Sequence, residues 1–219
     1  MYHYIEDKTF LKKMRGVCSN MINQLVQSIN NDSVMTVETH LVGSGARNLE
    51  TQNEKEPIDL DYNINIVNVL SIKINDGKKI KEYIQKMFDN VLKHNNLACC
   101  DDSKSVLSTK LMHLNDYKEI KFKIDLAIVS EDNKSSWYRL IHKKTGIIQN
   151  DEWFWNQGPD SNKLTSKANF IKNNNFWDEV RITYLKRKNM YLTKNDDNHS
   201  SFNCYIEAIN EIYKKHGGK

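Results

Sequence analysis

The stretch HLVGSGARN at residues 40–48, followed by PIDLDY at residues 57–62, decides the fold. The first of these predicts a strand that ends abruptly at its GSG turn. The second belongs to a run in which apolar and polar residues alternate, which predicts another strand. Asp59 and Asp61 stand two residues apart in that strand, so both carboxylates project from the same face of the sheet. We therefore expect two acidic side chains on one strand and a small-residue turn just before it.

The two carboxylates predict a site for a cation. Carboxylates this close repel each other unless a cation lies between them. Mg²⁺ takes oxygen ligands and commonly takes further ones from substrate phosphates. Asp125 stands between apolar neighbours in a later predicted strand, 119–129, which could place it beside Asp59 and Asp61. Three carboxylates in one place would suit a site for two metal ions.

The GSG turn predicts a phosphate cradle. A small-residue turn after a strand exposes backbone N–H groups and a hydroxyl, and Gly43 and Gly45 allow a phosphate to approach without a Cβ clash. Each signal also has a simpler reading, since an acidic pair is often the solvated face of an edge strand. The combination is more specific: a strand, Gly43-Ser44, a polar loop, the Asp59/Asp61 strand and then the Asp125 strand.

The rest of the chain predicts an α+β fold with a mixed sheet flanked by helices and a helical C-terminal lobe. We expect a catalytic core at residues 1–150 and the lobe at 151–219. The expected helices cover residues 6–30, 78–94, 160–172, 175–193 and 200–215. The expected strands cover residues 35–42, 58–70, 105–114, 119–129 and, at the edge of the sheet, 138–144. Residues 46–57 and 151–159 are expected to be loops.

Composition limits the class of protein. The 219 residues carry a formal net charge of +4, which permits a nucleic-acid or nucleotide partner without requiring one. We see neither an apolar run of membrane-spanning length nor a secretory signal. The four cysteines lack the CxxC spacing of a zinc site, so we expect reduced thiols and a cytoplasmic protein without membrane association.

The order of these motifs resembles the nucleotidyltransferase superfamily with the polymerase-β-type fold. Gly43-Ser44, Asp59, Asp61 and Asp125 match its motif one by one, although the spacer between the turn and the first aspartate is slightly long. The resemblance covers about residues 35–130. The leading helix and helical tail look more like the branch of oligoadenylate synthases and bacterial cyclic-oligonucleotide synthases than like the minimal antitoxin-type enzymes.

The resemblance implies an enzyme that transfers a nucleoside monophosphate from an NTP, ATP being the first candidate, to an acceptor hydroxyl with release of pyrophosphate. Asp59 and Asp61 would hold two Mg²⁺ or Mn²⁺ ions. Asp125 would ligate the catalytic ion and assist deprotonation of the acceptor, while Gly43 and Ser44 would hold the β- and γ-phosphates. The acceptor stays open: a nucleotide, an RNA 3′ end, a small molecule or a protein side chain. The alternatives are a catalytically silent nucleotide- or RNA-binding module and a toxin-system enzyme that modifies RNA or a partner protein.

Further candidates lie outside the motif. Arg47, just after the turn, could reach a phosphate. Residues 163–194 hold eight Lys or Arg against two acids, and Arg181, Tyr184 and Lys188 share one helical stripe that could bind a triphosphate and stack on a base. The alternative is a solvated basic face with Tyr184 in the core. Weaker candidates for a role at the site are Ser108, Lys110, His40, Trp153 and Trp155.

Overall fold

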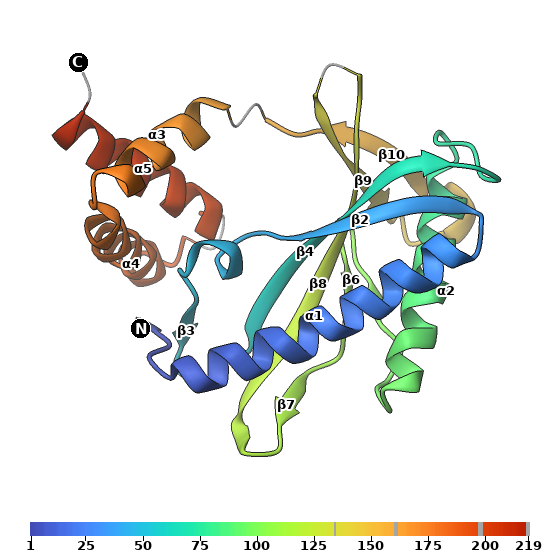
Figure 1. Cartoon of the computed structure of the whole chain (residues 1–219), viewed down its shortest axis with the longest axis horizontal. Coiled ribbons are helices and arrows are strands. Elements are labelled where there is room, and N and C mark those ends of the chain that lie inside the picture. Colours follow the sequence, from blue (N-terminus) through green and yellow to red (C-terminus); the bar gives the residue numbers. More distant parts are fainter. Residues whose placement is uncertain (134, 160–161, 197–198, 218–219) are drawn as a thin grey trace. The chain divides into compact units, whose positions relative to one another are not determined.

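A computed structural model describes residues 1–133, 135–159, 162–196 and 199–217 (Figure 1). The chain divides into two compact units. A sheet unit contains Asp7–Asn48 and Pro57–Pro159, and a helical unit contains Met1–Glu6, Leu49–Glu56 and Asp160–Lys219. No helix in the described ranges combines the length and the apolar character needed to cross a membrane.

The sheet unit is built on a mixed sheet, as predicted, and the order of its strands is β10-β9-β8-β4-β2. At its centre the parallel neighbours are β4 (Ile58–Val69) and β8 (Tyr117–Glu131). The antiparallel neighbours along this order are β2 (Met35–Leu41), β9 (Trp137–Lys143) and β10 (Glu152–Gln157). Shorter strands complete the sheet: β5 (Asp101–Asp102), β6 (Leu107–Ser108) and β7 (Met112–Leu114).

Two helices cover one face of this sheet, α1 (Lys8–Asn31) and α2 (Gly77–His94). On β4, Leu60 and Tyr62 are buried, whereas Asp59, which follows the buried residue Ile58, is exposed. The Tyr62 hydroxyl lies 3.0 Å from Ser19 Oγ of α1, which shows that the apolar side of β4 faces this helix. Because side chains alternate along a strand, the aspartates project from the opposite face.

The helical unit joins both ends of the chain. Strand β1 (Tyr2–Tyr4) pairs with β3 (Thr51–Asn53), and the helices are α3 (Asn162–Asn173), α4 (Trp177–Thr193) and α5 (Ser201–His216). Their apolar faces pack into a second core that includes Ile171, Tyr184 and Ile209. The unit therefore folds around its own buried side chains.

The structure differs from the expected elements at the edge of the sheet. The expected loop at 151–159 contains β10, and the expected edge strand is the inner strand β9. The Trp155 indole N–H donates to Ile74 O at 2.9 Å, so the aromatic residues of this segment fix a strand onto the sheet unit. The expected loop at 46–57 contains β3 and the short 3₁₀ turn η1 (Gly45–Arg47). The helix expected at 160–172 is described from Asn162, because residues 160–161 lie outside the described ranges.

The two units also differ in extent from the expected division at residue 150. Strand β10 belongs to the sheet unit, while β1 and β3 belong with the C-terminal helices. The pairing of β1 with β3 is a contact between short segments far apart in sequence, which no local pattern reveals.

Candidate active site

The turn after β2 is shaped by its first glycine. The Val42 N–H donates to Asp61 O at 2.8 Å, which holds the end of β2 beside β4. Gly43 then takes a φ of +65°, a left-handed conformation that favours glycine. A Cβ at Gly43 would overlap Asp61 Oδ2. The turn and the Asp61 carboxylate are therefore packed against each other, and glycine is needed for that contact.

The rest of the turn is tightly held as well. Gly45 is buried, and a Cβ there would lie 2.8 Å from a methyl group of Leu60. The Arg47 guanidinium donates from Nη1 to Gly43 O, so this side chain folds back on the turn backbone. Ser44 stands at the start of η1 with helical backbone angles. The structure thus builds the compact turn that the sequence predicts.

The register of β4 and β8 brings the three aspartates together. In this parallel pair Asp61 lies opposite Asp125, and Asp59 lies opposite Lys123. All four side chains stand at alternate positions and so project from one face of the sheet. The prediction that a neighbouring strand brings Asp125 beside the acidic pair is confirmed by this register.

Burial and the neighbouring carboxylates both disfavour the ionised form of Asp61. Its pKa is raised to about 6, first by burial, then by the Asp125 carboxylate and then by Asp59. Arg139 and Lys123 oppose this rise without cancelling it. Ionised Asp61 is therefore short of positive charge in this arrangement.

Two neighbours hold the Asp125 carboxylate. Ser108 Oγ donates to Asp125 Oδ1 at 2.6 Å, so this weaker candidate does reach the site. Lys123 Nζ lies 3.1 Å from Asp125 Oδ2 and 3.6 Å from Asp59 Oδ1. The sequence reasoning missed Lys123, although its place two residues before Asp125 in a strand was a sufficient signal.

The donor set fits a divalent cation. Three carboxylates on one face supply the hard oxygen ligands that Mg²⁺ and Mn²⁺ take. A cation bound there would offset the repulsion of Asp61 by Asp125 and Asp59, which adds to burial in raising the pKa of Asp61. Within the described ranges, no three acidic, His or Cys side chains converge closely enough to form a metal cluster as they stand. Here Lys123 Nζ lies between Asp59 and Asp125.

Several weaker candidates lie elsewhere. Lys110 pairs with Asp101 at 2.6 Å, and His40 lies 3.5 Å from Glu38. Trp155 anchors β10, as described above. These contacts give each residue a structural partner without involving the three aspartates.

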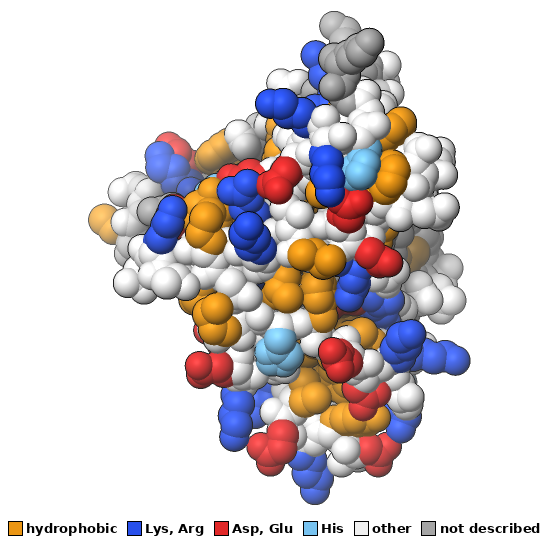
Figure 2. Space-filling model, turned by 90° about the vertical axis from the view of Figure 1, so that its left-hand side faces the viewer, with side chains coloured by type: hydrophobic (Ala, Val, Ile, Leu, Met, Phe, Trp, Pro, Cys, Tyr) orange, Lys and Arg blue, Asp and Glu red, His pale blue; other side chains and the backbone are white. Residues whose placement is uncertain are grey.

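The basic helix α4 is built differently from the predicted triphosphate stripe. Tyr184 is only 2% exposed and lies in the core, so the packing alternative describes it and the prediction that it stacks on a base is wrong. Arg181 lies over the ring of Tyr4 at 3.9 Å, and Lys188 lies over Tyr2 at 3.8 Å. On the face shown in Figure 2, Lys and Arg side chains are interspersed with acidic and hydrophobic ones rather than gathered in one patch.

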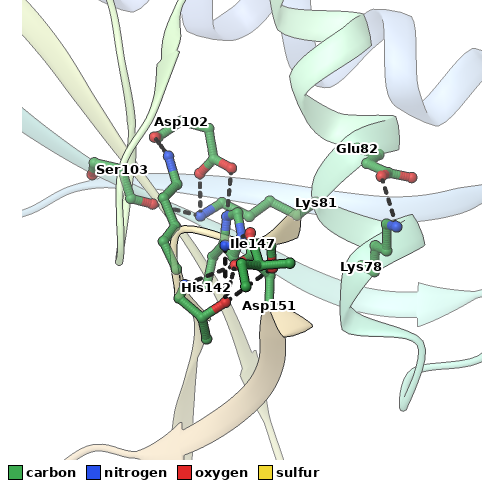
Figure 3. Close-up of polar contacts among 10 residues, drawn as sticks. Lys78, Lys81, Glu82, Asp102, Ser103, His142, Ile147 and Asp151 are labelled. Atoms are coloured by element: carbon green, nitrogen blue, oxygen red, sulfur yellow. Dashed lines mark hydrogen bonds and ion pairs between the residues drawn. The ribbon is translucent and has the colours of Figure 1, made fainter. Parts of the chain in front are cut away.

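A second polar cluster lies where α2, β5, β9 and the segment before β10 meet (Figure 3). The His142 ring lies 2.6 Å from Asp102 through Nδ1 and 3.0 Å from Asp151 through Nε2. Lys81, 2% exposed, pairs with Asp102 at 2.5 Å, and the ring of Trp153 stacks on His142. The residues of this cluster border a cavity of about 410 Å³. Because Lys81 and His142 each pair with an acid of this cluster, we assign the cluster to the stability of the fold.

No protein-family model matches the sequence, and no curated protein matches it. Solved structures do match. CdnC of E. coli MS115-1, solved in a complex with HORMA-deltaN, is 13% identical with a TM-score of 0.54 over 93% of this chain and 60% of that one. The chain shares the fold of CdnC.

Two further matches are more distant. The cyclic AMP-GMP synthase DncV of Vibrio cholerae is 12% identical with a TM-score of 0.45, covering 70% of this chain and 38% of that one. The CD-NTase CdnG of Bradyrhizobium diazoefficiens, in complex with GTP, is 9% identical with a TM-score of 0.38, covering 66% and 37%. The chain thus spans less than two thirds of the length of each of these structures. The predicted polymerase-β-like fold class is confirmed by the CdnC match.

Proposed function

We propose that the protein is a Mg²⁺- or Mn²⁺-dependent nucleotidyltransferase that moves a nucleoside monophosphate from an NTP to an acceptor hydroxyl. One observation carries this proposal. The parallel register places Asp61 opposite Asp125, with Asp59 on the same face, and Asp61 lies against the Gly43 turn. A carboxylate cluster beside a small-residue turn offers ligands for metal ions and backbone groups for phosphates.

In the proposed reaction, the acceptor oxygen attacks the α-phosphorus, and the bond from that phosphorus to the bridging oxygen breaks to release pyrophosphate. The divalent ions would neutralise charge on the phosphates and activate the acceptor hydroxyl. Asp59 and Asp61 would hold the ions. Asp125, oriented by Ser108 Oγ, would be a further ligand of the catalytic ion and would assist deprotonation by taking up the proton of the acceptor hydroxyl.

Gly43 and Ser44 are the proposed ligands of the β- and γ-phosphates. Gly43 has no side chain to block the approach, and Ser44 contributes a hydroxyl and a backbone N–H. Arg47 holds the turn in shape through Gly43 O and stays a proposed phosphate contact. Arg181 and Lys188 stay proposed triphosphate contacts, each with its charge above a tyrosine ring.

ATP is the proposed donor, and the proposed acceptor is a nucleotide or an RNA end. The donor, the acceptor and the product are tested together by incubation with each α-labelled NTP and Mg²⁺ or Mn²⁺, followed by chromatography and mass spectrometry. We expect pyrophosphate release and a labelled nucleotide or RNA product. Tight binding of an NTP without pyrophosphate release under any of these conditions would contradict the proposal and favour a silent binding module.

A further inference from the structure

Lys123 is the most unexpected residue of the candidate site. Its ammonium lies 3.1 Å from Asp125 Oδ2 and 3.6 Å from Asp59 Oδ1, so it joins two of the three proposed metal ligands. Its side chain is 28% exposed and that of Asp125 is 14% exposed. The Lys123–Asp125 pair is therefore partly shielded from water, and its attraction exceeds that of a fully exposed pair, whereas the Asp59 side chain is 48% exposed.

The strand geometry keeps Lys123 at this place. It is the direct register partner of Asp59 across the β4–β8 pair, and it stands two residues before Asp125 on β8. Both relations place its side chain on the face of the carboxylates. A lysine ammonium is ordinarily charged at neutral pH, so this side chain adds one positive charge beside the carboxylates.

We propose that Lys123 is a built-in counter-cation that competes with a divalent ion for Asp59 and Asp125. The inference rests on the proposed function, because it assumes that these carboxylates bind metal. Without metal, Lys123 offsets part of the repulsion among the three aspartates. An ion that takes oxygens from both Asp59 and Asp125 must displace the ammonium first. The metal affinity of the site is then set by this exchange as well as by the carboxylates.

The test is a Mn²⁺ titration of the full chain, followed by isothermal calorimetry and by the electron paramagnetic resonance signal of free Mn²⁺. Lys123→Met removes the competing charge, while Lys123→Arg keeps it. Lys121→Met is the matched control: it removes one charge from an exposed lysine at the next position on the same face of β8. We expect Lys123→Met to bind Mn²⁺ at least about tenfold more tightly than wild type, and Lys121→Met to bind like wild type.

Thermal unfolding supplies a second readout that does not depend on activity. In EDTA, Lys123→Met should unfold at a lower temperature than wild type, since the carboxylate repulsion is no longer offset. Mn²⁺ should then raise its unfolding temperature more than that of wild type. Equal Mn²⁺ affinity in wild type and Lys123→Met, or equal tightening in Lys121→Met, would overturn the inference.

The same titration distinguishes failure of the inference from failure of the proposed function. If wild type binds Mn²⁺ and Asp61→Asn does not, the metal site stands, and only the comparison with Lys123→Met decides the inference. If neither wild type nor Lys123→Met binds Mn²⁺ at millimolar concentration, both the metal site and the competition are overturned.

Discussion

Asp61→Asn should stabilise the metal-free protein at high pH and abolish nucleotidyl transfer. The pKa of Asp61 is raised from 3.8 to about 6, so its neutral form is favoured in the folded state. The stability that this group contributes is fully present below the pKa that Asp61 has in the unfolded chain. It is lost as the pH rises through the pKa that Asp61 has in the folded protein. Wild type should therefore lose stability between about pH 4 and pH 6 because of this group.

The magnitude follows from the size of the shift. A difference of about two pKa units corresponds to about 3 kcal/mol at 1.36 kcal/mol per unit, an upper limit for a group that retains some contact with water. Asn cannot ionise, so at pH 8 the variant should unfold at a higher urea concentration than wild type. Its free energy of unfolding should exceed that of wild type by up to about 3 kcal/mol. At pH 3.5 the two proteins should be nearly equal.

The assay is urea unfolding in EDTA at several pH values, followed by circular dichroism, and repeated with Mn²⁺. Mn²⁺ should remove the advantage of the variant, because a bound cation stabilises the ionised carboxylate of wild type. Asp101→Asn, at an exposed acid outside the cluster, is the control and should show no such gain. A difference between wild type and Asp61→Asn that does not change with pH would refute the reasoning.

Three further perturbations test the surroundings of the site. Gly43→Ala should lower the free energy of unfolding by about 1 kcal/mol through backbone strain and by more through the overlap with Asp61. Gly146→Ala is the control, because Gly146 also has a positive φ but a Cβ there would meet no atom within 4 Å, so only the strain should appear. Equal losses of both variants in urea unfolding would contradict the contact between the turn and Asp61. Ser108→Ala should lower the rate of nucleotidyl transfer severalfold, because Asp125 loses a 2.6 Å hydrogen bond. The rate is measured by pyrophosphate release, and thermal unfolding checks that the variant is folded. An unchanged rate would show that Ser108 does not orient Asp125. Lys81→Met should lower the free energy of unfolding by about 3 kcal/mol, because it leaves Asp102 without its ammonium partner. Lys86→Met, at an exposed site of the same helix, is the control and should have little effect. Equal effects of the two variants in urea unfolding would contradict a structural role of the second polar cluster.

The sequence was sufficient to predict the main strands and the three acids. Alternation along β4 separates Leu60 and Tyr62 from Asp59, and this pattern follows from the geometry of a strand alone. The turn was predicted because Gly43-Ser44-Gly45 ends the strand pattern of residues 35–42 abruptly. Lys123 was missed although the same alternation places it beside Asp125.

Other features depend on contacts between segments far apart in the chain. The role of β10 rests on its pairing with β9 and on the Trp155 hydrogen bond to Ile74 O, and neither has a local signature. Tyr184 shared a helical stripe with two cations, yet that position faces the core of the helical unit. A helical period indicates which residues share a face, and only tertiary packing decides whether that face is buried.

The most direct test of the central claim is pyrophosphate release from α-labelled NTPs with Mg²⁺ or Mn²⁺, comparing wild type with Asp125→Asn. The same thermal unfolding profile in both proteins would establish that the variant is folded. We predict metal-dependent pyrophosphate release by wild type and a loss of at least about a hundredfold in the variant. Equal release by both proteins would contradict the account, since Asp125 would then have no part in the reaction.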